Sequence, residues 1–145
     1  MIVYLGLGAN LGNREETINR AVELLSEQVG PLIKRSSFFY SKPFGFESPN
    51  DFCNICASFD TLLSPLDLLH TTQGIERALG RTQKSHNGIY HDRTIDIDIL
   101  LLFDNDGHSI NVNYQMSNVN LLTIPHPEIK KRDFVTSPLS EILLN

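Results

Sequence analysis

Two aspartates, two positions apart, are the strongest chemical feature of the sequence. Residues 93–100 read Arg-Thr-Ile-Asp-Ile-Asp-Ile-Leu, a pattern typical of a β-strand. Successive side chains of a strand face opposite sides, so Asp96 and Asp98 share one face and the isoleucines share the other. Carboxylates about 7 Å apart on one face repel each other unless a cation lies between them, and oxygen ligands suit Mg²⁺. The pattern predicts a magnesium site; the plainer interpretation is the solvated face of an amphipathic strand.

Basic residues lie on both sides of this pair in the sequence, as expected where a small polyphosphate meets a metal ion. They are Arg77, Arg81, Lys84, Arg93, Lys130, Lys131 and Arg132. The chain as a whole is acidic, with a formal net charge of −5, which disfavours nucleic acid as a partner. The charge pattern therefore indicates a small anionic ligand.

Length and composition indicate one globular domain spanning residues 1–145. The chain has 145 residues, of which 41% are hydrophobic and 20% charged, as in ordinary globular proteins. No apolar run approaches the ~20 residues of a membrane span, and residues 1–6 carry no signal-peptide pattern. We therefore expect a cytoplasmic protein without a membrane partner.

The two cysteines, Cys53 and Cys56, form a C-x-x-C motif. Such a motif is compatible with a redox pair or half a zinc site. Residues 52–59 resemble a strand, which places positions i and i+3 on opposite faces, and no second cysteine pair exists. We predict two buried structural thiols.

The hydrophobic periodicity predicts the elements that must position these residues. Helices are expected from the cap Asn13 to Gly30 and from the cap Ser64 to Gly80. The expected strands are residues 2–8, 32–40, 52–62 and 94–103, followed by an irregular hairpin around Asp106-Gly107 within 104–120, a short strand at 121–124 and a C-terminal helical turn. This order is that of an α+β ferredoxin-like sandwich, an antiparallel sheet with helices packed on it. Its first and fourth strands are expected as neighbours at the centre.

Three further segments are candidates for ligand contacts. Gly6, Gly8 and Gly12 do not match a nucleotide-binding motif, so we expect them to allow a tight turn close to a ligand. Gln73 and Glu76 share a helix face, where they either bind a ligand or are solvated. Residues 81–92 lack an apolar period and have the length of a mobile lid.

An ordered series of short motifs is similar to the 6-hydroxymethyl-7,8-dihydropterin pyrophosphokinases, folate-pathway enzymes that move pyrophosphate from ATP to a pterin. The series comprises Gly8-Ala-Asn-Leu-Gly12, Phe52-Cys-Asn54, Gln73-x-x-Glu76, Gly80-Arg81, Arg93-Thr-Ile-Asp-Ile-Asp98, Pro125-His126 and Arg132-x-Phe134. It covers essentially the whole chain. Each motif is weak alone, whereas R-T-x-D-x-D with P-H downstream is specific.

The resemblance implies a Mg²⁺-dependent in-line displacement that releases AMP. Asp96 and Asp98 would bind two Mg²⁺ ions, and Arg81 and Arg93 would join them as catalytic residues. The nucleophile would be the substrate's own hydroxymethyl group. ATP would be the co-substrate, 6-hydroxymethyl-7,8-dihydropterin the acceptor, and the enzyme a monomer.

The resemblance also implies two sets of binding residues. The pterin ring would lie between Phe52 and Phe134, with Asn54 supplying both a donor and an acceptor to its edge. The pterin set is Asn10, Ser41, Phe44, Phe52, Asn54, Tyr90 and Phe134. The ATP set is Gln73, Glu76, Arg81, Lys84, Arg93, His126 and Arg132, in which Glu76 would accept from the ribose.

The chain departs from the family pattern in the predicted lid. Gln83 stands near the place of a usual second arginine, a role that passes to Lys84, and Tyr90 replaces a common tryptophan. Pro127 stands where an aromatic is sometimes found, and the segment 104–120 is expanded. Two other classes remain as alternatives: another metal-dependent nucleotidyl or phosphoryl transferase on the same fold, and a non-enzymatic RNA-binding module, which the acidic chain disfavours.

Overall fold

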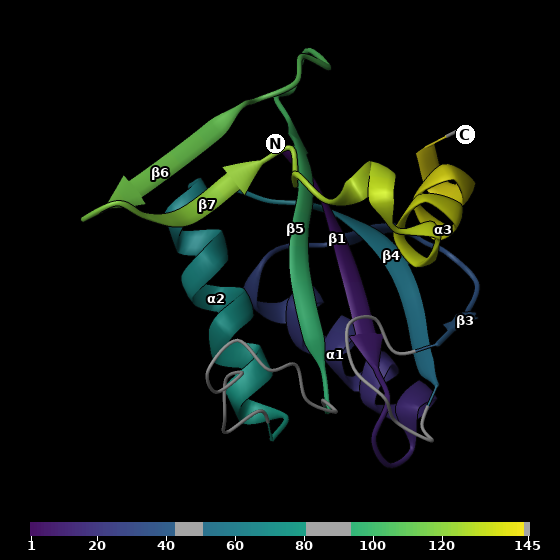
Figure 1. Cartoon of the computed structure of the whole chain (residues 1–145). Helices are drawn as coiled ribbons and strands as arrows, with labels where there is room; N and C mark the ends of the chain where they lie inside the picture. Colours follow the sequence, from purple (N-terminus) through teal and green to yellow (C-terminus); the bar gives the residue numbers. More distant parts are fainter. Residues whose placement is uncertain (43–50, 81–93, 144–145) are drawn as a thin grey trace.

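The computed structural model describes residues 1–42, 51–80 and 94–143, which form one main antiparallel sheet with helices on both faces (Figure 1). The strands run β2-β4-β1-β5 across the sheet, and β3 also pairs with β4. They are β1 (Ile2–Ala9), β2 (Leu32–Arg35), β3 (Phe39–Ser41), β4 (Phe52–Asp60) and β5 (Asp96–Phe103). The predicted α+β class is confirmed, and the first and fourth predicted strands, β1 and β5, are neighbours. The predicted central place is confirmed for β1, which lies between β4 and β5, and is wrong for β5, which lies at the end of the sheet.

The first two helices begin at the caps expected from the sequence. The Asn13 carboxamide oxygen accepts from the Glu16 N–H at 3.2 Å, and α1 (Arg14–Gln28) follows. The Ser64 hydroxyl accepts from the Asp67 N–H at 3.2 Å, and α2 (Pro65–Ala78) follows. At the far end of α1, a Cβ on Gly30 would overlap the carbonyl oxygen of Asp60, so only glycine fits there.

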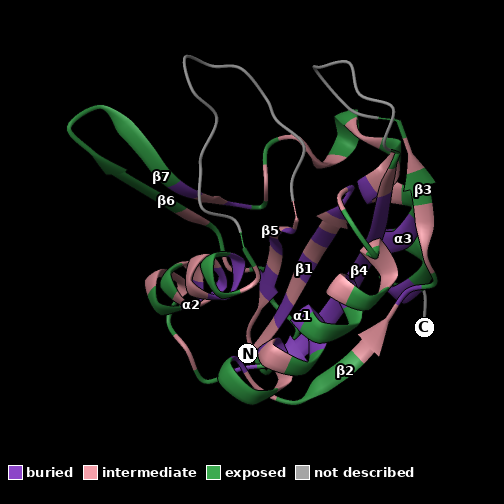
Figure 2. Cartoon of the chain, turned by 90° about the horizontal axis from the view of Figure 1, so that it is seen from below, coloured by how far each residue is buried: buried purple, intermediate pink, exposed green. Residues whose placement is uncertain are grey.

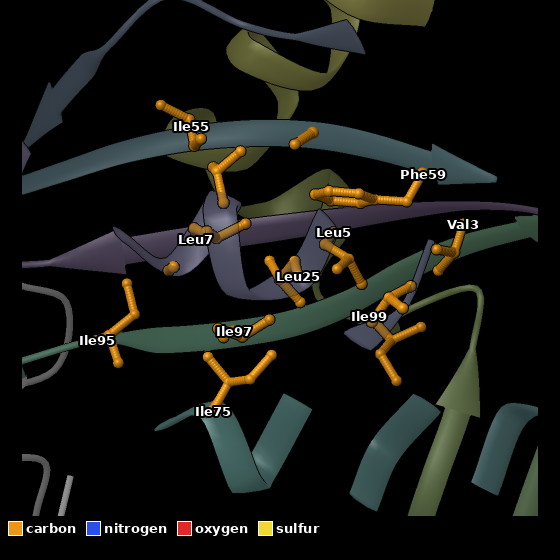
Figure 3. Packing of buried hydrophobic residues seen from close by; sticks show 14 of the residues in the cluster. Val3, Leu5, Leu7, Leu25, Ile55, Phe59, Ile75, Ile95, Ile97 and Ile99 are labelled. Carbon is orange, nitrogen blue, oxygen red and sulfur yellow. The ribbon is translucent and has the colours of Figure 1, made fainter. Parts of the chain in front are cut away.

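The main core lies between the sheet and these two helices. The isoleucine face of β5 packs there, with Ile97 beside Ile75 of α2, while Leu5 of β1 lies near Leu25 of α1 (Figure 3). All of these side chains are nearly inaccessible to solvent. The predicted alternation of β5 is therefore confirmed, and its aspartate face points away from this core.

The opposite face of the sheet carries a third layer. After the short helix η1 (Ile129–Lys131), α3 (Asp133–Leu143) packs on β4 and buries Val135, Leu139 and Ile142 against Cys56 and Leu100. The sequence predicted a single helical turn here, which is too short. The sequence did not indicate the full length of α3 because it contains Pro138. An interior proline removes a backbone donor and usually ends a helix.

The predicted strand 32–40 is divided into β2 and β3. Between them, the buried Ser36 hydroxyl accepts from the Cys56 N–H at 3.0 Å, in the place of a backbone carbonyl. The Ser36 N–H donates to the Cys56 carbonyl at 2.8 Å. A side chain thus interrupts the regular ladder of backbone hydrogen bonds, which hydrophobic alternation alone does not reveal.

A second, two-stranded sheet projects from the body, with exposed residues toward its tip (Figure 2). It consists of β6 (Val112–Met116) and β7 (Val119–Ile124), and its turn is at Ser117 and Asn118, both with positive φ. The predicted hairpin turn at Asp106-Gly107 is confirmed, because Phe103 and Ser109 form an antiparallel bridge across it. This turn lies directly after β5, and in it Gly107 donates to the Asp104 carbonyl. The prediction of one hairpin in 104–120 is nevertheless incomplete, since β6 and β7 form a second one. Among the described helices, none is long and apolar enough to cross a bilayer.

Candidate active site

Two rows of residues run across three strands on the face that α3 partly covers. The first row is Asp96 on β5, Gly8 on β1 and Asn54 on β4. The second row is Asp98, Gly6 and Cys56 on the same strands. Directly opposed residues of neighbouring strands face the same side. The two carboxylates therefore flank one side of a central strand that has no side chains there.

The glycines of β1 form the floor of the site. A Cβ on Gly8 would lie 2.9 Å from the Asn54 Oδ1, and one on Gly6 would lie 3.3 Å from the Leu100 Cδ1. The predicted turn is wrong for these two residues, which are inside β1. Gly12, with φ +64°, does lie in the turn that follows. Gly6 and Gly8 thus keep the floor open and let a flat ligand approach the backbone.

A cleft, here called the aromatic cleft, opens above this floor. It brings together seven residues predicted from the resemblance: Ser41, Phe52, Asn54, Asp96, Asp98, Arg132 and Phe134. Gly6 and Gly8, which were expected close to a ligand, also line it. Five further lining residues were not predicted: Leu7, Lys42, Ile55, Cys56 and Val135. Alternation along β4 carries the signal for Cys56, because it shares a face with predicted residues. No sequence pattern indicates Lys42 or Val135.

The carboxamide of Asn54 has a fixed orientation. Its Nδ2 donates to the Ser41 Oγ at 2.8 Å and to the Phe39 carbonyl at 3.2 Å. A carbonyl only accepts, so the atom facing it is the nitrogen, and the oxygen is directed toward Gly8 and the cleft. The expectation that Asn54 supplies both a donor and an acceptor to a ligand stays a prediction; in this structure, its nitrogen is bound to β3. The acceptor is the atom that Asn54 offers to the cleft here.

Arg132 links the carboxylates to the aromatic wall of the cleft. One of its terminal nitrogens lies 3.9 Å from an oxygen of Asp98, and its guanidinium carbon lies 5.8 Å from the ring centre of Phe134. A planar guanidinium suits both a carboxylate and a ring face, and it also binds phosphate. Arg132 thus places a positive charge between the aspartate pair and the aromatic cleft.

A second groove, here called the edge groove, follows the outer edge of β5 toward α2 and β7. Its lining residues are Leu69, Ile97, Asp98, Ile99, Asn120, Leu121, Leu122, Thr123, His126 and Pro127. Of the predicted ATP residues, His126 lines this groove and Arg132 lines the aromatic cleft. Asp98 lines both cavities, so they meet at the aspartate pair.

His126 is held as a neutral ring. Its Nδ1 accepts from the Glu128 N–H at 3.1 Å, which assigns the ring proton to Nε2. Burial lowers the pKa of His126 below its usual 6.5, and the nearby charge of Arg132 lowers it further. His126 therefore presents a neutral N–H donor rather than a cation.

Gln73 and Glu76 occupy different environments on α2. Gln73 is half-buried, whereas Glu76 is only 6% exposed and its Oε2 accepts from the Ile97 N–H at 2.8 Å. Neither residue is part of the lining of the two cavities. The simple picture of two polar residues on a helix surface is wrong for Glu76, which connects α2 to the aspartate strand.

Both cysteines are buried free thiols on opposite faces of β4, as predicted. Burial raises the pKa of Cys53 to about 11 and that of Cys56 to about 12, the latter helped by the charge of Asp98. Cys56 directs its sulfur to the Val135 carbonyl, 3.7 Å away. Neither thiol is a nucleophile near neutral pH.

The donor set of the aspartate pair fits Mg²⁺. Both carboxylates are half-buried on one face, where oxygen ligands can be completed by phosphate oxygens and water. A separate group, Asp104, Asp106 and His108, also has ligand atoms close together. The Asp104 Oδ1 already accepts from the N–H groups of Asp106 and His108, both at 2.9 Å, so this group closes an exposed turn.

Most of the remaining predicted residues belong to segments that the structure does not describe. The whole predicted lid, residues 81–92, lies outside the described residues, as do Phe44 and Arg93; Arg81, Lys84 and Tyr90 are part of that lid. Asn10 is described and is buried directly after β1.

Comparisons with known proteins agree with this geometry. A family model described as 7,8-dihydro-6-hydroxymethylpterin-pyrophosphokinase (HPPK) matches residues 4–144. A relative from Porphyromonas gingivalis, named 2-amino-4-hydroxy-6-hydroxymethyldihydropteridine pyrophosphokinase, is 49% identical over 97% of this chain and 90% of its own. A Bacillus subtilis relative of the same name is 37% identical over 97% of this chain and 77% of its own.

Solved structures give the same fold. The chain is similar to a Plasmodium falciparum HPPK-DHPS crystal structure with a TM-score of 0.68 at 16% identity. The match covers 97% of this chain and 39% of that one, so this chain spans well under half of the bifunctional protein.

These matches identify the class as enzymes that transfer phosphate groups from ATP. The chain belongs to the 7,8-dihydro-6-hydroxymethylpterin-pyrophosphokinase family and is an ATP-dependent pyrophosphokinase of folate biosynthesis.

Proposed function

We propose that the aromatic cleft binds 6-hydroxymethyl-7,8-dihydropterin, that the edge groove binds ATP, and that pyrophosphate passes between them at the aspartate pair. The observation that carries this proposal is that Asp98 lines both cavities. A transfer reaction requires the attacking oxygen and the phosphorus under attack to meet, and the two substrates to lie on opposite sides of that point. The relatives' names supply the substrate class, and the cavities supply a place for each substrate.

Each cavity has the chemistry of its proposed ligand. Phe52 and Phe134 offer π faces to a flat ring, and the Asn54 oxygen accepts from an N–H on its edge. On the other side, apolar residues of the edge groove suit a purine, and the neutral His126 offers a donor to a phosphate oxygen.

The proposed reaction balances without an enzyme nucleophile. The pterin hydroxymethyl oxygen attacks the β-phosphorus of ATP, the bond from that phosphorus to the oxygen bridging to the α-phosphate breaks, and AMP leaves. The hydroxyl proton passes to solvent. Asp96 and Asp98 would hold two Mg²⁺ ions, which when bound neutralise phosphate charge and orient both oxygens. Arg132 adds a fixed positive charge on the side of the aromatic cleft.

The test is AMP formation from ATP with the hydroxymethylpterin as acceptor, compared with 6-methyl-7,8-dihydropterin. The methyl analogue keeps the ring and loses only the nucleophilic oxygen, so it is expected to bind and to yield no AMP. Formation of ADP, or equal AMP with both pterins, would contradict the proposal and favour another phosphoryl transfer or simple hydrolysis.

The pterin position is tested by Phe52→Ala and Phe134→Ala. Each is expected to weaken pterin binding several-fold, because ring stacking contributes about 0.5–1.5 kcal/mol beyond buried area. Calorimetric titration measures this, and Phe134→Leu is the control that keeps apolar volume without a π face. Binding of a non-hydrolysable ATP analogue should not change; an equal loss for both ligands would argue against separate cavities.

A further inference from the structure

Glu76 is a buried carboxylate attached to the strand that carries the aspartate pair. It lies on α2, is 6% exposed, and its Oε2 accepts from the Ile97 N–H at 2.8 Å. Ile97 is the residue between Asp96 and Asp98. This hydrogen bond therefore connects α2 to the centre of the aspartate segment.

The position of β5 in the sheet gives this bond its importance. On one side, β5 pairs with β1 through Gly8 opposite Asp96 and Gly6 opposite Asp98. Backbone groups alternate in direction along a strand, and the Ile97 N–H points to the other side, away from β1. Among the strands that the structure describes, β5 is the last of the main sheet, so no strand supplies an acceptor for the Ile97 N–H. Glu76 takes the place of a strand there and fixes the outer side of the backbone.

We propose that Glu76 is a positioning residue that sets the directions of Asp96 and Asp98 through the Ile97 N–H. This differs from the role in ATP ribose binding that the family resemblance implies. Asp96 and Asp98 precede and follow Ile97 in the sequence, and their side chains share one face of β5. A shift of the backbone at Ile97 therefore moves both carboxylates together. The inference rests on the proposed function of the two aspartates as magnesium ligands.

Three substitutions separate the effect of the side-chain length of Glu76 from the effect of its charge. Glu76→Gln keeps the length and an oxygen acceptor but loses the charge, whereas Glu76→Asp keeps the charge and withdraws it by one methylene. Glu76→Ala removes both. We expect Asp and Ala to raise the Mg²⁺ concentration required for binding of an ATP analogue by roughly 10–100-fold, the usual cost of losing a group that orients a metal ligand. Gln should stay close to wild type.

Two measurements need no turnover. Amide hydrogen exchange of Ile97 in the ligand-free protein should accelerate in Glu76→Asp and Glu76→Ala and stay slow in Glu76→Gln. Pterin binding without Mg²⁺ should be similar in all variants, which also reports that the sheet is folded. Asp67→Asn, an exposed acid on the same helix, is the matched control and should change neither quantity.

Deoxy analogues of ATP distinguish the two roles. If Glu76 acts through Ile97, the ratio of affinities for ATP over 2′-deoxy-ATP and over 3′-deoxy-ATP stays at its wild-type value in all three variants. If the ratio falls to one in Glu76→Ala, Glu76 binds the ribose and the proposal is overturned. It is also overturned if Glu76→Gln behaves like Glu76→Ala, or if Glu76→Asp needs no more Mg²⁺ than wild type. If the wild type itself forms no AMP, the proposed function fails, while the Ile97 exchange data still decide whether Glu76 holds this peptide.

Discussion

Asp96 and Asp98 share one face of β5 but differ in their neighbours. Asp98 lies 3.9 Å from Arg132, in an ion pair whose side chains are 31% and 18% exposed. For Asp96→Asn, stability should hold or rise, because repulsion between like charges on one strand face costs about 0.2–1 kcal/mol. For Asp98→Asn, lost attraction to Arg132, about 0–1 kcal/mol, should offset the gain.

Both variants should lose AMP formation by roughly 10²–10³-fold or more. Urea denaturation and the AMP assay measure the two effects; near-wild-type turnover in either variant would refute the central assignment.

His126 predicts a pH effect with a definite sign. Its folded-state pKa is lowered below the ordinary 6.5, so the unfolded chain takes up the proton first as pH falls. The contribution of His126 to stability is therefore complete above pH 6.5 and declines as pH falls toward the lowered value. His126→Asn, which retains an acceptor near the Glu128 N–H, should flatten this part of the profile. The measurement is the difference between the urea midpoints at pH 7.5 and pH 5.5 in the wild type and the variant. An equal difference in the two proteins would contradict the prediction.

At single positions, the sequence predicted which residues belong to the site more reliably than it predicted which of their atoms form hydrogen bonds. Alternation placed Asp96 and Asp98 on one face correctly, because a two-residue period depends only on backbone geometry. It could not show that the nitrogen of Asn54 binds Ser41 and Phe39, since those partners come from β3. The bond from Glu76 to Ile97 was likewise invisible, because it depends on how α2 meets β5.

At the scale of elements, β1 combines two glycines with a central place in the sheet. Gly8→Ala should weaken pterin binding, because the new Cβ would lie 2.9 Å from the Asn54 Oδ1 and displace the acceptor from the cleft. Gly6→Ala is the matched comparison. Its Cβ would meet the flexible end of Leu100 at 3.3 Å, so a smaller effect on pterin binding is expected. Calorimetry with pterin ranks the two variants, and equal affinities would mean that Gly8 does not protect the Asn54 position.

The elements with local signals were predicted, and those that depend on distant partners were not. Caps at Asn13 and Ser64 fixed the starts of α1 and α2, because a cap satisfies N–H groups within its own helix. In contrast, α3 contains Pro138 and is stabilised by packing on β4, so its length was underestimated. The division of β2 from β3 depends on a bond from Ser36 to Cys56, twenty residues later.

At the scale of the whole molecule, the aromatic cleft and the edge groove are joined at Asp98, the lining residue they share among those the structure describes. Because Asp98 lines both, occupation of the edge groove by an ATP analogue with Mg²⁺ should change pterin affinity, and pterin should change analogue affinity by the same factor. The coupling is expected to fall strongly in Asp98→Asn, since the shared charge is then lost. A calorimetric cycle with each ligand alone and together measures it. If the coupling between the two affinities in Asp98→Asn were as large as in the wild type, residues other than Asp98 would be responsible for it.

The formal net charge of −5 is not concentrated in the aromatic cleft, where the charges of Arg132 and Lys42 balance those of Asp96 and Asp98. The predicted monomer and the predicted lack of nucleic-acid binding stay predictions. Sequential motifs identified the family because its site is assembled from short segments in a fixed order. The sheet brings Gly8, Asn54 and the aspartate pair, from three of these segments, to one face.

The bare floor over Gly6 and Gly8 would make a pterin bound there a structural component of the protein. Where α3 does not cover the sheet, a bound pterin would supply the apolar layer that side chains supply elsewhere. A ligand that binds only the folded chain stabilises it by mass action, by about 2.7 kcal/mol when its concentration is a hundred times the dissociation constant. The lifetime of the enzyme against cellular proteases would then follow the supply of its own substrate, so a cell starved of pterin would also retain less of the enzyme that uses it.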